Sequence, residues 1–160
     1  MELRKVDEPI KDKLKLATQY AKEGHLDSAI ALLKSMIEQW PENEVTRGLL
    51  ASIYLQIGMQ AQAVEHYEIL LDTHPENSLA RFQLGMAKLS QGKPEEALDV
   101  WEPMLSLKNE FMANFHSALA LLQLNRPQEA LQRLLEAKQK MPASHPFYPQ
   151  LMKLHDQLTA

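Results

Sequence analysis

The sequence contains no cysteine, and it has few glycines and few aromatic residues. The missing thiols exclude disulfides, cysteine nucleophiles and thiolate metal sites. They do not distinguish the cytosol from the periplasm. Only five glycines and 6% aromatic residues occur among 160, while Leu, Ala, Gln, Glu and Lys are frequent. This composition favours helices over a turn-rich β architecture.

Long apolar runs are also missing. No stretch of 18 apolar residues exists, and the charged start MELRKVDEPIKDK lacks the apolar core of a secretory signal. We therefore expect no direct membrane insertion and a cytoplasmic location, with the soluble part of a membrane-anchored or periplasmic protein as the alternative. A hydrophobic content of 45% is ordinary for one soluble domain with a core.

The charge distribution argues against nucleic acid as a partner. The formal net charge is −4, and residues 24–110 hold 13 acidic against 6 basic side chains. An acidic middle repels phosphate, and no basic stripe that could release counterions is present. We expect no nucleic-acid binding.

Catalytic and cofactor motifs are absent from the sequence. It has no HExxH, GxxxxGK[ST] or GxSxG motif and no glycine-rich phosphate loop. The six histidines show no metal-ligand spacing. His116 and Ser117 are neighbours, but adjacent residues on a helix point about 100° apart, so they do not form a base and nucleophile pair. We expect no enzyme, no cofactor and no metal.

The sequence repeats with a period of 34 residues. WPEN at 40–43 returns as HPEN at 74–77, and Gly24, Gly58 and Gly92 lie 34 apart. A fourth copy arrives one residue early, which aligns Asn125 with the glycines and places a deletion near residues 107–110. A fixed period of this length is typical of stacked helical repeats.

Each copy reads as two helices that flank the Gly or Asn turn, because apolar residues recur three and four positions apart. The predicted helices span residues 10–23, 26–39, 43–57, 60–73, 77–91, 94–106, 110–124 and 127–140. Asn43 and Asn77 are expected to cap the helices that follow them. Pro103 is expected to kink its helix or end it early, because it cannot donate to the carbonyl of Asp99.

The repeat resembles the tetratricopeptide repeat (TPR) family. The family's Leu column corresponds here to Leu16, Leu50, Leu84 and Ser117. Its small-residue column corresponds to Ala17, Ala51, Gly85 and Ala118. Its Ala column corresponds to Ala29, Ala63, Ala97 and Ala130. A further column holds the large residues Leu33, Tyr67, Trp101 and Leu134. The resemblance implies an all-α fold, a right-handed superhelical α-solenoid of stacked antiparallel helix pairs, with these columns in the core.

The domain organisation follows from the same alignment. We expect an N-terminal extension at 1–9 and four repeats at 10–43, 44–77, 78–110 and 111–144. A C-terminal capping helix at 145–160, with Ser144 as its N-cap, is expected to place Phe147, Leu151, Leu154, His155 and Leu158 on one side.

The resemblance also implies a function, since the first helices of TPR pairs line a concave groove that binds peptides. Carrying the groove columns over gives a peptide-binding set of Leu14, Thr18, Ser52, Leu79, Phe82, Gln83, Met86, Met112, Phe115, His116 and Leu119. We expect Phe82, Met86 and Phe115 to be exposed in this groove. The carboxylate clamp of some TPR proteins is absent, because its positions hold Leu14, Thr18, Leu49, Leu79 and Gln83.

Two functional interpretations remain open. The first is a non-enzymatic, chaperone-like adaptor or scaffold that binds a protein or peptide partner through an apolar or amphipathic segment, as some secretion chaperones and assembly factors do. The second is a structural self-assembly module that forms homo-oligomers through its groove or its end repeats.

Overall fold

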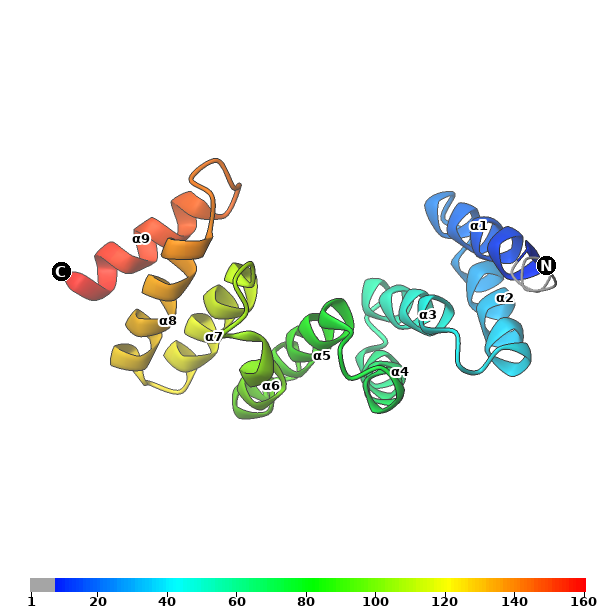
Figure 1. Cartoon of the computed structure of the whole chain (residues 1–160), viewed down its shortest axis with the longest axis horizontal. Helices are drawn as coiled ribbons and strands as arrows, with labels where there is room; N and C mark the ends of the chain where they lie inside the picture. The colour runs from blue at the N-terminus through cyan, green and yellow to red at the C-terminus, as the bar shows by residue number, and fades with distance from the viewer. Residues whose placement is uncertain (1–7) are drawn as a thin grey trace. The chain divides into compact units, whose positions relative to one another are not determined.

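The computed structural model describes residues 8–160, and this part of the chain is all-helical, which confirms the expected fold class. Its elements are α1 (Glu8–Lys22), α2 (Leu26–Gln39), α3 (Glu44–Gln56), α4 (Gln60–Thr73), α5 (Ser78–Ser90), α6 (Pro94–Trp101), the 3₁₀ turn η1 (Glu102–Met104), α7 (Phe111–Gln123), α8 (Pro127–Lys140) and α9 (Tyr148–Thr159) (Figure 1). The chain divides into two compact units, one through Ala80 and one from Arg81.

The N-terminal boundary differs from the expected one. Helix α1 begins at Glu8, so Glu8 and Pro9 are helical although we assigned them to an extension. Proline is tolerated in the first turn of a helix, where its missing N–H has no partner to lose. Residues 1–7 of the expected extension lie outside the described residues.

The Gly and Asn turns have one geometry. Gly24, Gly58, Gly92 and Asn125 all have positive φ, at 82°, 78°, 73° and 55°. In each turn the next backbone N–H donates to a carbonyl five residues back, as from His25 to Tyr20 at 2.8 Å. This hydrogen bond and the left-handed residue form a Schellman motif, which ends the first helix of the pair. Asn125 is therefore equivalent to the glycines, as the alignment predicted.

Helix α6 ends early, as Pro103 predicted. It stops at Trp101 after eight residues, and Pro103 lies inside η1. A proline at this position cannot donate to the carbonyl four residues back, so the α-helix gives way to a tighter turn.

The start of α9 was predicted wrongly. We expected a helix from residue 145 with Ser144 as its cap, but α9 begins at Tyr148, and Phe147 precedes it without a side-chain cap. In the expected helix Pro149 would have to donate to the carbonyl of His145, which proline cannot do. Starting at Tyr148 places Pro149 in the first turn, where it fits.

The N-terminal unit packs α1 on α2, α2 on α3 and α3 on α4. Ala17, Ala29, Ala51 and Ala63 are fully buried where these helices approach each other. The expected burial of Leu16 is wrong, because Leu16 is 40% exposed while its equivalent Leu50 is 0% exposed. Leu50 lies on α3, which packs against the preceding helix α2. Leu16 lies on α1, and no described helix precedes α1 to pack against it in the same way.

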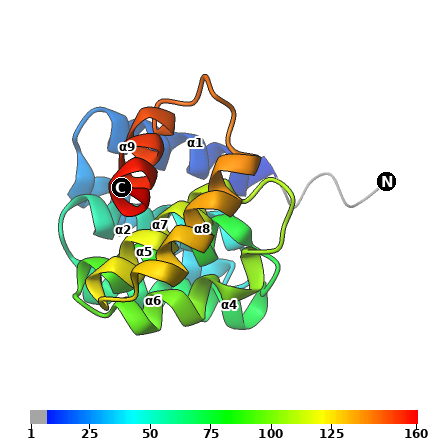
Figure 2. The same ribbon diagram turned by 90° about the vertical axis from the view of Figure 1, so that its left-hand side faces the viewer.

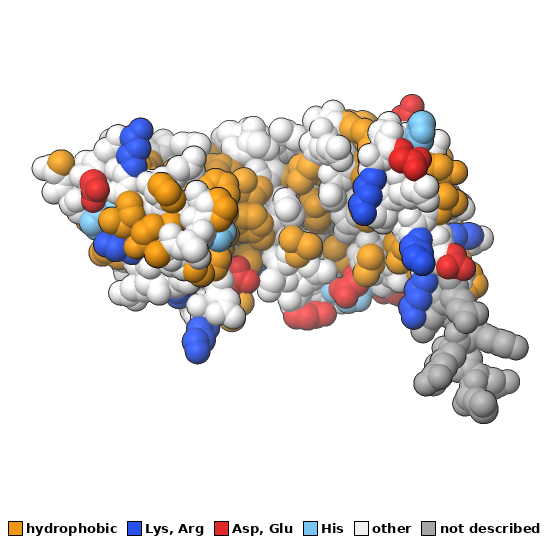
Figure 3. Space-filling model, turned by 90° about the horizontal axis from the view of Figure 1, so that it is seen from above, with side chains coloured by type: hydrophobic (Ala, Val, Ile, Leu, Met, Phe, Trp, Pro, Cys, Tyr) orange, Lys and Arg blue, Asp and Glu red, His pale blue; other side chains and the backbone are white. Residues whose placement is uncertain are grey.

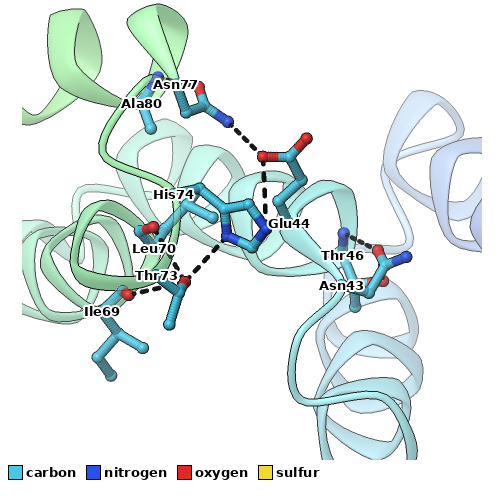
Figure 4. Close-up of polar contacts among 9 residues, drawn as sticks. All are labelled: Asn43, Glu44, Thr46, Ile69, Leu70, Thr73, His74, Asn77 and Ala80. Atoms are coloured by element: carbon cyan, nitrogen blue, oxygen red, sulfur yellow. Dashed lines mark hydrogen bonds and ion pairs between the residues drawn. The ribbon is translucent and has the colours of Figure 1, made fainter.

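Polar contacts fix the start of α3 and of α5 (Figure 4). The Asn43 side chain accepts a hydrogen bond from the Thr46 N–H at 2.9 Å, and Asn77 accepts one from the Ala80 N–H at 2.8 Å. Both predicted N-caps are confirmed. Asn77 also donates to the Glu44 carboxylate at 3.3 Å, which lies 4.0 Å from His74. These contacts hold the first turn of α5 beside the first turn of α3.

In the C-terminal unit the largest core residue faces the smallest. Trp101 is 0% exposed, and its indole lies against Gly85, where a Cβ atom would overlap Nε1 and Cε2 of the ring. The indole N–H donates to the Phe82 carbonyl at 3.1 Å. Helices α7, α8 and α9 enclose a second cluster that contains Leu134 and Leu151, with α9 packed on α8 (Figure 2).

Candidate functional site

An apolar face lies on α5 and α7 in the C-terminal unit. Each of these helices contributes three half-buried side chains, which rest on the core clusters beneath them: Phe82, Met86 and Leu89 on α5, and Met112, Leu119 and Leu122 on α7. Helix α7 has no Asp, Glu, Lys or Arg in its 13 residues. Figure 3 shows hydrophobic side chains gathered over this C-terminal part of the chain. We call these six residues and His116 the apolar face.

Aromatic rings are continuous beneath and beside this face. The Phe82 ring stacks on Trp101 with centroids 6.2 Å apart, and its edge meets His116 at 5.6 Å. His116 in turn contacts Phe115 at 5.3 Å, and Phe115 contacts Phe147 at 6.1 Å. Because each ring is held by the next, the face is a firm surface rather than a set of independent side chains.

His116 is the titratable group in the apolar face. Burial among the rings lowers the pKa of its imidazole below the ordinary value, because desolvation disfavours the charged form. Within the described residues neither ring nitrogen makes a hydrogen bond. The imidazole is therefore neutral at neutral pH, and its two ring nitrogens are polar atoms in an otherwise apolar surface.

The expected exposure of Phe115 is wrong. Its side chain is only 4% exposed, whereas Phe82, in the same column of the repeat, is half-buried. Phe115 belongs to the cluster that includes Leu151, and Phe147 contacts its ring. Helix α9 and the residue before it thus cover the position, so Phe115 supports the face from below and does not reach a partner.

The other predicted groove residues divide between the two units. Seven of them lie in the C-terminal unit, where the structure brings them together on α5 and α7: Phe82, Gln83, Met86, Met112, Phe115, His116 and Leu119. The remaining four, Leu14, Thr18, Ser52 and Leu79, belong to the N-terminal unit.

The four residues of the N-terminal unit comprise two leucines and two hydroxyl residues on three different helices. Leu14 and Thr18 are half-buried, and the Thr18 hydroxyl donates to the Leu14 carbonyl of its own helix at 2.8 Å. Ser52 is exposed. Leu79 is 70% exposed, the most of any large hydrophobic residue in the described chain.

Val45 and Phe147 are exposed apolar residues that the predicted groove set does not contain. Val45 is 57% exposed and lies 34 residues before Leu79, so applying the repeat period to Leu79 would have identified it. Phe147 is 38% exposed beside Phe115 and His145. No periodic signal marks Phe147, because it precedes the last helix.

Two other kinds of site have no candidate within residues 8–160. Residues 8–160 contain no group of three or more His, Asp or Glu side chains that could hold a metal ion. No helix in the same range has both the length and the apolar character needed to cross a membrane.

Comparison with known proteins places this geometry in a family. One tetratricopeptide repeat model matches residues 20–65, and another matches residues 49–103 and 83–146, which together exceed half of the chain. No curated protein matches the sequence.

Solved structures show the same fold. A structure of MamA (AMB-1) is 29% identical, with a TM-score of 0.71 over 79% of this chain and 70% of that chain. Another MamA structure is 17% identical, with a TM-score of 0.78 over 93% and 85%. YrrB, described as a TPR protein with an unusual peptide-binding site, is 18% identical, with a TM-score of 0.76 over 99% and 82%. TPR proteins are in general non-enzymatic scaffolds for protein–protein interaction. The chain belongs to the tetratricopeptide repeat family.

Proposed function

We propose that this protein is a non-enzymatic adaptor that holds an apolar or amphipathic peptide segment of a partner protein on the apolar face. One observation carries the proposal: α5 and α7 present half-buried Phe, Met and Leu side chains around a neutral histidine, and α7 has no charged residue. Apolar side chains that remain partly exposed on a structured surface gain free energy when a partner covers them.

The side chains suit a partner of variable shape. Met86 and Met112 are unbranched and polarizable, so they adapt to different apolar groups. Phe82, stacked on the buried Trp101, adds a rigid aromatic contact to the same face. Either an amphipathic helix or an extended segment could use such a face. YrrB supports the proposal only through its similar fold, since its sequence identity is 18%.

The imidazole of His116 and the amide of Gln83 would orient the segment. Both side chains are half-buried at the apolar face, and both offer donors and acceptors to a peptide backbone. A charged group placed against Met86 or Met112 would lose hydration without gaining an ionic partner on α7. The proposal therefore predicts selection against acidic and basic residues at the centre of the bound segment.

A binding experiment on the full chain tests the proposal. The tagged protein captures its partner from the native source, and fluorescent peptides that tile the partner's apolar segments are then titrated by anisotropy. We expect the double variant Met86→Glu, Met112→Glu to weaken the best peptide at least about tenfold. Met59→Glu is the matched control, because Met59 is an exposed methionine of the other unit. Equal affinity for a folded double variant would refute the assignment of this face.

A further inference from the structure

A cleft separates α6 and η1 from α8 on the C-terminal unit. It consists of two adjoining cavities of about 320 and 450 Å³, which share Glu102, Leu105 and Arg133 as lining residues. Leu98, Leu105 and Leu121 contribute apolar lining to the cavity of about 320 Å³. The proposed function makes no use of this cleft.

The early end of α6 and the loop after it shape the cleft. Helix α8 has 14 residues, but α6 has only eight before η1 begins at Glu102. The Leu105 carbonyl after η1 accepts hydrogen bonds from Asn114 at 3.0 Å and from Lys140 at 2.8 Å. These bonds fix the loop against α7 and α8, so the cleft is part of the folded structure.

The cleft is lined by five carboxylates and three cations, which leaves an excess of two negative charges: Glu95, Asp99, Glu102, Glu129 and Glu136 against Arg126, Arg133 and Lys140. Arg126 is paired with Glu129 through two hydrogen bonds of 2.7 and 2.6 Å, and Lys140 is occupied by the Leu105 carbonyl. Asp99 and Glu102 are exposed along α6 and η1, and neither forms an ion pair with a described residue. The cleft edge therefore complements a segment that carries positive charge at helical spacing.

Helix α1 of the same chain is such a segment. A shallow depression of about 770 Å³ on α1 is lined by three exposed lysines and one exposed carboxylate, Lys11, Lys15, Lys22 and Asp12, together with the half-buried Leu14 and Thr18. Figure 3 shows Lys and Arg side chains near the N-terminal end of the chain. Lys11 and Lys15 are four residues apart, and Asp99 and Glu102, which line the cleft, are three residues apart. Charges spaced by one helical turn on both surfaces can face one another when two helices lie side by side.

We infer that the cleft between α6 and α8 receives α1 of a second copy of this chain. Lysines of α1 would lie against Asp99 and Glu102, and the aliphatic stems of these lysines would cover the leucine lining. Each copy has one α1 and one cleft, so the contact is heterologous and joins copies head to tail. The residues of this contact are not those of the apolar face, so the inference does not rest on the proposed function.

Charge reversal on the full chain tests the inference by analytical ultracentrifugation. The variant Lys11→Glu, Lys15→Glu and the variant Asp99→Lys, Glu102→Lys each place like charges together, so each should weaken self-association at least about tenfold. An equimolar mixture of the two restores opposite charges at both contacts and should associate like the wild type. Association of the wild type should weaken as salt rises from 0.05 to 0.5 M, because these charges are exposed.

Two charge-reversal variants outside the proposed contact serve as controls. Lys153→Glu and Glu38→Lys reverse exposed charges outside the cleft and α1, and both should associate like the wild type. All reversed residues are exposed, and circular dichroism checks that each variant is folded. A wild type that stays monomeric at low salt and high concentration overturns the inference. Association that survives both charge-reversal variants, or a mixture that fails to associate, also overturns it.

Discussion

Gly85 and Trp101 form a size-matched pair, so Gly85→Ala should destabilise the fold although it replaces glycine in a helix. The new Cβ would overlap Nε1 and Cε2 of a fully buried indole and lie 2.7 Å from Cδ1. Carbon atoms settle about 3.5–4.0 Å apart, so the ring must move by roughly 1 Å or more. Overpacking costs about 1–3 kcal/mol, and weakening the bond from Trp101 to the Phe82 carbonyl costs about 1 kcal/mol more. Helix propensity returns about 1 kcal/mol, which leaves a net loss of about 1–3 kcal/mol.

Gly48→Ala is the matched control and should have the opposite sign. Gly48 also lies in a first helix, α3, but a Cβ there would meet only the Leu70 Cδ2 atom at 3.6 Å, an ordinary contact. The propensity gain of up to about 1 kcal/mol then appears without strain. Urea denaturation of both variants measures the two free energies of unfolding.

A double-mutant cycle connects the effect to the indole. Trp101→Leu alone should destabilise by leaving a cavity. In that background Gly85→Ala should no longer cost stability, because the equivalent positions hold Leu134 and Ala118, which share one buried cluster. We expect a coupling free energy of about 1–3 kcal/mol. Equal stabilisation by Gly85→Ala and Gly48→Ala, or additive effects in the cycle, would refute the reasoning.

Two further predictions concern polar groups. His116 has a lowered pKa in the folded state, so the unfolded chain binds this proton more tightly, and the free energy of unfolding should fall as pH drops through and below 6.5. The pKa of His66 is also lowered, so His66 contributes a loss of stability of its own as the pH falls. In thermal melts from pH 7.5 to 5.5, His116→Phe should therefore lose less stability than the wild type, but it should still lose some. Asn77→Ala removes the cap of α5 and the bond to Glu44, and should cost about 0.5–2 kcal/mol in urea denaturation. Asn109→Ala, at an exposed position, should stay within about 0.5 kcal/mol of wild type, and equal effects of the two substitutions would contradict the capping role.

Most of the fold could be predicted because each helix has local start and stop signals. Helices α2, α4 and α8 have the predicted bounds, since each begins after a Gly or Asn turn and ends two residues before a proline. Pro103 likewise predicted the early end of α6. The start of α9 was missed because a cap at Ser144 competes with Pro149, and the proline decides the result. Weighing both signals together would have excluded a start at residue 145.

The exposure of the candidate site was harder to predict, because the repeat period does not say which helix covers a given position. A 34-residue period identifies positions with equivalent places in a helix pair, as for Leu16 and Leu50 or Phe82 and Phe115. Whether such a position reaches solvent depends on the next helix in the stack. Leu16 is exposed because α1 has no described helix before it, and Phe115 is buried because α9 follows α7. Both errors lie at the ends of the repeat array, where periodicity no longer supplies the neighbour. A groove transferred column by column is therefore most reliable on internal helices such as α5, and Phe82 and Met86 are the residues to vary first.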